Sequence, residues 1–217
     1  MFESRVNGRS NRLAVMSGWM ILAAAAATSP IATAVAAEAS TASSSPRAAT
    51  AQLPAEKQTT LGLYVTAKEA YQRWEAAPDK VKILDVRTPE EVMWVGHAPM
   101  AWKVPVVAVT YQWDADKKQF PMRPLPDFVA RVQKVATPDD TLMVMCRSGG
   151  RGAMAVNLLA KAGFKNVYNI TDGMEGDPVK DPDSVFRGQR MVNGWKNSGL
   201  PWTYELDPAL MVLPAGP

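Results

Sequence analysis

The residue best suited to covalent chemistry is Cys146, the one cysteine in a chain of 217 residues. It is followed by the short loop Arg147-Ser-Gly-Gly-Arg-Gly152, which is cationic and rich in glycine. Glycine lets a backbone curl tightly enough to aim several N–H groups at one atom, and the two arginines add positive charge. Such surroundings favour the thiolate form of a cysteine, which is the nucleophilic form. The residue types therefore predict a nucleophilic cysteine that needs no neighbouring histidine.

Two apolar segments must hold this loop in place. The run Leu142–Met145 predicts a buried strand, and Ala153–Ala162 has the apolar spacing and the residue types of a helix. Cys146 is therefore expected between the carboxyl end of a strand and the amino end of a helix, where the helix dipole also favours negative charge. The alternative is an inert buried thiol, which is common for single cysteines. The pair Gly149-Gly150 and the flanking arginines argue against it, because they are poor surroundings for apolar burial.

The segment Cys146-Arg-Ser-Gly-Gly-Arg151 resembles the active-site loop of the rhodanese (sulfurtransferase) family. The resemblance extends from about Tyr64 to Trp202. Further motifs follow in the family's order, and they are Ile83–Glu91, Gly96–Pro99, Gly163–Tyr168, Asp172-Gly173, Gly194-Trp195 and Gly199–Pro201. The ordered set implies a rhodanese-like domain in a single-domain, exported member of the family.

The resemblance implies transfer of sulfane sulfur from a small anionic donor such as thiosulfate. Cys146 would carry the sulfur as a persulfide and pass it to a thiol or a cyanide-like acceptor. The other residues of the loop, which would bind the substrate, are Arg147, Ser148, Gly149, Gly150, Arg151 and Gly152. Their backbone N–H groups would stabilise the negative persulfide as an oxyanion hole stabilises an oxyanion. Neither a metal nor an organic cofactor is expected.

Two other functions stay open. Cysteine phosphatases and arsenate reductases use a similar loop, but their arginine stands six positions after the cysteine, which makes room for a tetrahedral oxyanion. Here Arg151 stands five positions after Cys146, and the sixth position is Gly152. A non-enzymatic rhodanese-like module, which binds or carries sulfur, is the third candidate, although such modules often lose the cysteine. The shorter loop with its cysteine intact favours sulfur transfer.

Four titratable residues outside the loop could take part in acid–base chemistry or support the fold. Asp85, Arg87 and Glu91 are expected to form an ion pair that fixes a strand-to-helix junction, as the resemblance also implies. His97, the only histidine, lies in the turn Gly96–Pro99 and is expected to be structural, with its ring satisfied by the backbone. A single cysteine and a single histidine far apart in the sequence do not make a zinc site.

Strands alternate with helices along the chain, which predicts an α/β fold. The expected architecture is rhodanese-like and doubly wound, with a mostly parallel sheet and helices on both faces. The expected elements are a helix opened by the capping box Thr66–Glu69, a strand at Val81–Asp85, a helix opened by Thr88–Glu91, a strand at Trp102–Val109, a helix at Pro126–Val135 and a strand at Asn166–Ile170. Between the strand at Trp102–Val109 and the helix after it, a hairpin around Asp114–Lys117 or a long loop is expected. Ligands of such sheets bind at the carboxyl ends of the strands, where Cys146 falls.

The amino-terminal segment reads as a secretory signal peptide over residues 1–37, with basic residues, an apolar stretch and small residues at Ala34–Ala37 suited to cleavage. An uncleaved membrane anchor is the alternative, but the apolar part is shorter than the ~20 residues of a spanning helix. A periplasmic protein, free of the membrane after cleavage, is therefore expected. The expected parts of the mature chain are a disordered spacer at 38–60, the domain at 61–206 and a tail at 207–217.

The net charge and the number of cysteines limit the classes of partner that are expected. The formal net charge is +3, and two of these charges come from the leader, where Arg5, Arg9 and Arg12 outnumber Glu3. No nucleic-acid partner is therefore expected. In an oxidising compartment, a single cysteine indicates a free reactive thiol. The expected partners are the small donor and acceptor, together with a periplasmic sulfur-carrier or redox protein.

The stretch Met174–Asn193 is longer than the corresponding link in compact members of the family. Its first half is rich in aspartate and proline, which suits a surface loop. Its second half holds the apolar side chains of Val185, Phe186, Met191 and Val192, which are expected to fold back over an apolar rim. Two hypotheses stay open, namely a lid that selects the acceptor and an insertion packed away from the site.

Overall fold

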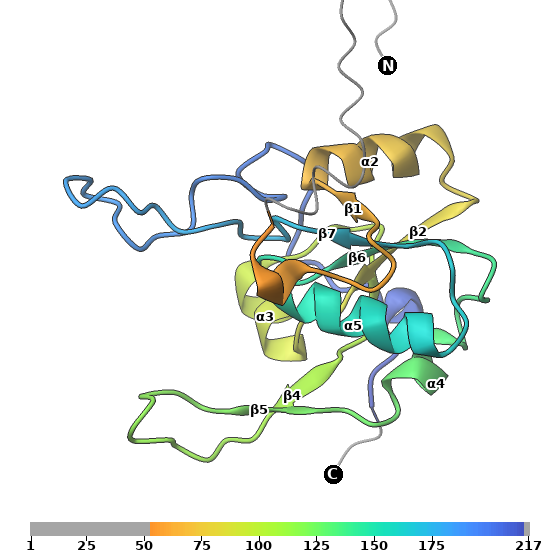
Figure 1. Cartoon of the computed structure of the whole chain (residues 1–217), viewed down its shortest axis with the longest axis horizontal. Helices are drawn as coiled ribbons and strands as arrows, with labels where there is room; N and C mark the ends of the chain where they lie inside the picture. The colour runs from red at the N-terminus through yellow and green to blue at the C-terminus, as the bar shows by residue number, and fades with distance from the viewer. Residues whose placement is uncertain (1–52, 215–217) are drawn as a thin grey trace, which may run out of the picture. The chain divides into compact units, whose positions relative to one another are not determined.

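The computed structural model describes residues 53–214, and Figure 1 shows a central sheet with helices around it. In this part of the chain, five strands form a parallel sheet in the order β1-β7-β6-β2-β3, and β4 and β5 form an antiparallel pair. The strands are β1 (Tyr64–Val65), β2 (Val81–Asp85), β3 (Trp102–Lys103), β4 (Val107–Val109), β5 (Met122–Pro124), β6 (Thr141–Met145) and β7 (Val167–Ile170). The helices are α2 (Ala67–Ala76), α3 (Pro89–Val95), α4 (Phe128–Val132) and α5 (Gly150–Lys161), with short 3-10 turns η1 (Ala55–Lys57) and η2 (Pro208–Leu210). The predicted α/β fold with a mostly parallel sheet is confirmed.

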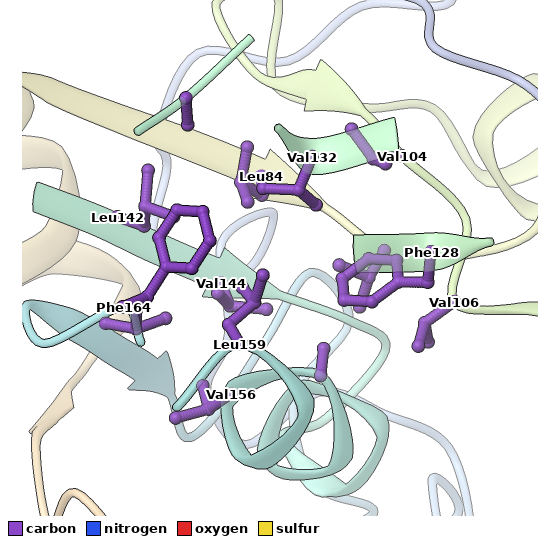
Figure 2. Packing of buried hydrophobic residues seen from close by; sticks show 14 of the residues in the cluster. Leu84, Val104, Val106, Phe128, Val132, Leu142, Val144, Val156, Leu159 and Phe164 are labelled. Carbon is purple, nitrogen blue, oxygen red and sulfur yellow. The ribbon is translucent and has the colours of Figure 1, made fainter. Parts of the chain in front are cut away.

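Helices cover both faces of this sheet, with α2 on one side and α5 on the other (Figure 1). Side chains alternate along a strand, so β6 sends Leu142 and Val144 into the core that α4 and α5 complete (Figure 2). Met143 and Met145 enter a second core, which includes the buried face of α2. The strand is therefore buried on both faces, which explains its continuous apolar sequence.

Capping boxes begin two of the helices, as the sequence predicts. The Thr66 hydroxyl accepts a hydrogen bond from the backbone of Glu69, and the Glu69 carboxylate accepts one from the backbone of Thr66 at 2.7 Å. Thr88 and Glu91 form the same reciprocal pair at the start of α3, where Pro89 occupies the first helical position. Each box satisfies two backbone donors that the helix itself leaves unpaired.

The single strand expected at Trp102–Val109 is instead two strands, β3 and β4. Pro105 has no backbone N–H and cannot donate to a ladder, so β3 ends before it, and after it only Val106 still donates to the β2 side, to the carbonyl of Val86 at 3.1 Å. β4 then pairs with β5, and the predicted hairpin between them is present, with Asp114 bridged to Gln119. The helix expected at Pro126–Val135 is also shorter, since α4 covers only Phe128–Val132.

The segment before the domain differs from its prediction. Residues 53–60 fall within the predicted disordered spacer, but they contain η1 and the buried side chain of Lys57. The backbone of this segment is held by amides of the domain, since Asn169 donates to the Lys57 carbonyl at 3.0 Å and Thr60 donates to Asn157 at 2.8 Å. The signal peptide and residues 38–52 lie outside the described residues. Within residues 53–214, none of the helices has the length and apolar character needed to cross a membrane.

The insertion Met174–Asn193 projects from the end of β7 as a long loop (Figure 1). Isolated bridges join Pro178 to Arg190 and Val179 to Arg187, so its two limbs run side by side near the domain. The expectation that its apolar side chains cover a rim is wrong. They remain exposed to solvent, and they are Val185, Phe186, Met191 and Val192.

A fully buried ion pair connects β2 with the turn after α3. The Arg87 guanidinium donates to both carboxylate oxygens of Asp85, and its Nη2 lies 2.6 Å from Oδ2. The same Nη2 donates to the carbonyl of Gly96 at 2.8 Å. Neither side chain is exposed, so each charge depends on the other for its solvation.

We predict that Arg87→Met lowers the free energy of unfolding by about 3 kcal/mol, because it leaves the Asp85 carboxylate buried without its partner. Urea unfolding followed by circular dichroism measures this loss. The double variant Asp85→Asn/Arg87→Met should recover more than half of it, since no charge then stays buried. A loss below about 1 kcal/mol in the single variant would contradict the structural role of the pair.

Candidate active site

Cys146 stands directly after the last residue of β6, and its side chain is only 1% exposed. The backbone N–H of Gly149 donates to its sulfur, with 3.1 Å between N and Sγ. This geometry requires the φ of +102° that Gly149 adopts, and a Cβ there would lie 2.5 Å from the carbonyl oxygen of Thr171. A glycine is therefore needed for the loop to present this N–H to the sulfur.

The helix α5 begins immediately after this turn, at Gly150, three residues earlier than the sequence predicts. Its N-cap is Gly149, so its first turn starts beside the sulfur. The amino end of a helix carries a partial positive charge and unpaired N–H groups. Both features stabilise negative charge on Cys146 or on an atom bonded to it.

The chain after β7 supports the loop from behind. Met174 donates to the carbonyl of Cys146 at 2.8 Å, and Glu175 donates to the carbonyl of Arg147 at 3.0 Å. The approach is close enough that a Cβ on Gly173 would lie 2.4 Å from the Cys146 oxygen. The chain at the Asp172-Gly173 motif thus holds the backbone of Cys146 and Arg147 in place.

Two buried polar residues beside the loop, Asn169 and Asp172, are absent from the predicted site. Asn169 is fully buried and donates to the carbonyls of both Gly149 and Lys57, at 3.1 and 3.0 Å. Asp172 accepts hydrogen bonds from the backbone of Ala67 and Gly194, although burial raises the pKa of its carboxyl group. The only sequence signal for Asn169 is an amide inside the apolar strand Val167–Ile170.

The two loop arginines have different surroundings. Arg151 forms a bidentate ion pair with Glu91, with both N–O distances at 2.6 Å. Glu91 therefore joins Arg151, and the expectation that it belongs to the Asp85–Arg87 pair is wrong. Burial acts to raise the pKa of Glu91, but the hydrogen bonds and charge of Arg151 outweigh it and lower that pKa. Arg147 is exposed, and its side chain makes no hydrogen bond to any described residue.

His97 lies apart from this chemistry, in the turn after α3. Its Nδ1 is 3.1 Å from the carbonyl oxygen of Ala98, while the buried Nε2 has no partner within residues 53–214. The backbone therefore satisfies one of the two ring nitrogens. Burial lowers the pKa of His97, which favours the neutral ring. No hydrogen bond joins it to Cys146 among the described contacts.

The Glu91–Arg151 pair predicts a dependence of stability on pH. Because the pKa of Glu91 in the folded protein lies below 4.5, its contribution is complete above that pH and is lost as the pH falls through the folded value. Glu91→Gln should therefore cost about 1 kcal/mol near neutral pH, and this cost should shrink as the pH falls through the folded pKa of Glu91. Urea unfolding of both proteins across this range measures the difference. Glu75→Gln, on the exposed face of α2, is the control, and a cost for Glu91→Gln that stays constant with pH would refute the assignment.

Comparison with known proteins agrees with this geometry. A model of the Rhodanese-like domain family matches residues 66–177, which is more than half of the chain. "Thiosulfate sulfurtransferase 16, chloroplastic" from Arabidopsis thaliana is 37% identical over 92 residues, which cover 42% of this chain and 69% of the relative. "Uncharacterized protein RP600" from Rickettsia prowazekii is 30% identical over 122 residues, covering 56% of this chain and 82% of the relative. Among solved structures, Rv0390 from M. tuberculosis is 26% identical, with a TM-score of 0.47 and coverage of 65% of this chain and 96% of its own. The chain therefore belongs to the family of rhodanese-like domain proteins.

Proposed function

We propose that the protein is a sulfurtransferase that carries sulfane sulfur as a persulfide on Cys146. The thiolate attacks the outer sulfur of thiosulfate, a new S–S bond forms, and sulfite leaves with the electrons of the bond that breaks. Charge is conserved, because a thiolate and a dianion become a persulfide anion and a dianion. The observation that carries the proposal is the N–H of Gly149, 3.1 Å from Sγ, at the amino end of α5.

The two arginines of the loop have different roles, because their surroundings differ. Arg151 is engaged on both nitrogens by Glu91, so it fixes the loop to α3. Arg147 is exposed beside the nucleophile and can attract the dianionic donor from solvent. Both arginines are predicted to attract the anionic donor, with locking of the loop as the alternative role for one of them. The contacts support donor attraction for Arg147 and the locking role for Arg151.

The ion pair of Arg151 also bears on the phosphatase alternative. A loop that stabilises a phosphoryl group needs a guanidinium free to bind its equatorial oxygens. Here Glu91 occupies both terminal nitrogens of Arg151. This supports sulfur transfer, as does the name of the thiosulfate sulfurtransferase among the relatives. We place the activity in the periplasm, on the strength of the leader and the single cysteine.

The first prediction is that thiosulfate adds the mass of one sulfur atom to the reduced protein. Cyanide should remove this mass, because it accepts the outer sulfur. Intact mass spectrometry of wild type and Cys146→Ser measures both steps, and the serine variant should show neither. If Cys146 stays unmodified in the folded protein, the proposal is contradicted and the non-enzymatic binding module is favoured instead.

The second prediction concerns Arg147. Arg147→Ala should raise KM for thiosulfate about fivefold, the value of one exposed charge contact. High salt screens this contact, so it should raise the KM of wild type toward that of the variant. Steady-state kinetics at low and high ionic strength test this. Lys161→Ala, which removes an exposed charge at the far end of α5, is the matched control. Equal KM values for wild type and Arg147→Ala at low salt would remove Arg147 from donor binding.

A further inference from the structure

Two segments outside the family match meet beside the active loop. They are residues 53–60, which precede it, and residues 178–193, which follow it. Lys57 of the first segment pairs with Asp177, at the base of the insertion, with 2.8 Å between Nζ and Oδ1. Asp177 is held in turn by Asn193, whose side-chain oxygen accepts its backbone N–H at 2.7 Å. Figure 1 shows this contact region, where the orange segment passes the base of the blue insertion.

Between these segments lies a cleft of about 850 Å³ that reaches the active loop. Ser148 and Gly150 of the loop form part of its wall. Its charged lining residues are Glu56, Lys57, Asp172, Asp177, Lys180 and Arg190. The volume is in the range of sites that enclose small organic molecules, and thiosulfate would leave most of it empty.

The charges that line the cleft have both signs. Lys57 and Asp177 neutralise each other, and the pKa of Asp172 is raised by burial while its oxygens accept backbone N–H groups. Lys180 and Arg190 remain on the insertion, facing Glu56 on the amino-terminal segment. None of these three forms an ion pair within residues 53–214. Arg190 is anchored by a hydrogen bond of 2.6 Å from Nη1 to the carbonyl of Gly176, which fixes its guanidinium at the cleft.

We propose that this cleft binds the sulfur acceptor, and that the acceptor is a small zwitterionic thiol, an amino acid or short peptide that carries carboxylate, ammonium and thiol groups. Lys180 and Arg190 would bind its carboxylates, and Glu56 its ammonium group. The proposal rests on the sulfurtransferase function. In the step, the acceptor thiolate attacks the outer sulfur of the Cys146 persulfide. A new S–S bond forms in the acceptor, the bond to Sγ breaks, and Cys146 keeps that electron pair as a thiolate.

Charge arrangement favours this class over the alternatives. A site for inorganic anions needs a net positive wall, whereas this cleft is lined by three basic side chains, Lys57, Lys180 and Arg190, and by three carboxyl groups, those of Glu56, Asp172 and Asp177. Cyanide or a neutral thiol would use none of them. The base of the insertion is then a wall of the acceptor site. The hypothesis that the insertion selects the acceptor therefore applies to the residues at its base, such as Lys180 and Arg190.

The test compares four thiols as acceptors for the persulfide of the full chain, each at the same thiolate concentration. The probes are glutathione, cysteamine, 3-mercaptopropionate and 2-mercaptoethanol. Glutathione should discharge the persulfide about tenfold faster than 2-mercaptoethanol, with the two singly charged thiols between them. Arg190→Gln should reduce the ratio of the glutathione rate to the cyanide rate about fivefold. Arg187→Gln, an exposed arginine of the same insertion outside the cleft, should keep the wild-type ratio.

A binding measurement separates this proposal from the sulfurtransferase function. S-Methylglutathione has no free thiol, and calorimetry should show it binding saturably to Cys146→Ser and more weakly to Cys146→Ser/Arg190→Gln. Equal discharge rates for all four thiols, or no binding of S-methylglutathione, would overturn the cleft as an acceptor site. Absence of any persulfide in wild type would instead overturn the function, while the binding result would still report on the cleft.

Discussion

The site depends on one contact, the N–H of Gly149 directed at the sulfur of Cys146. A neutral thiol gains little from this donor, but a thiolate or persulfide gains a charge-assisted hydrogen bond in a place that water hardly reaches. The contact requires the left-handed backbone of Gly149. A side chain at this position would collide with the carbonyl oxygen of Thr171, so only glycine fits. Asn169 then holds the carbonyl of the same glycine. The rest of the fold delivers these groups to one point.

Two carboxylates outside the loop show how the fold distributes its charges. Glu91 completes the capping box of α3 and also binds Arg151, so one side chain joins the start of a helix to the active loop. Asp85 has no such connection to the loop and serves the buried pair with Arg87. The charge left for substrate is that of Arg147. A loop with one fixed and one exposed arginine can be rigid and still attract anions.

Local patterns in the sequence predicted what local physics decides. The caps at Thr66 and Thr88, the strand Val81–Asp85 and the position of Cys146 at a strand end depend on neighbours in the chain, and the structure has all of them. Contacts across long stretches of chain could not be read in this way. Lys57 sits in a polar segment that resembles a spacer, yet it is ordered by Asn169 and Asp177, both more than 100 residues away. The apolar residues of the insertion gave a false signal, because side chains such as Phe186 stay in solvent.

The most direct test of this account is a crystal structure of the protein treated with thiosulfate. The account predicts one additional sulfur atom bonded to Sγ of Cys146, at about 2.05 Å, with N–H groups of the loop directed at it. The bidentate contact between Glu91 and Arg151 should remain in place. A cysteine that carries no added sulfur, or an added sulfur that points away from the loop N–H groups into solvent, would contradict the claim that this backbone cradle activates the nucleophile.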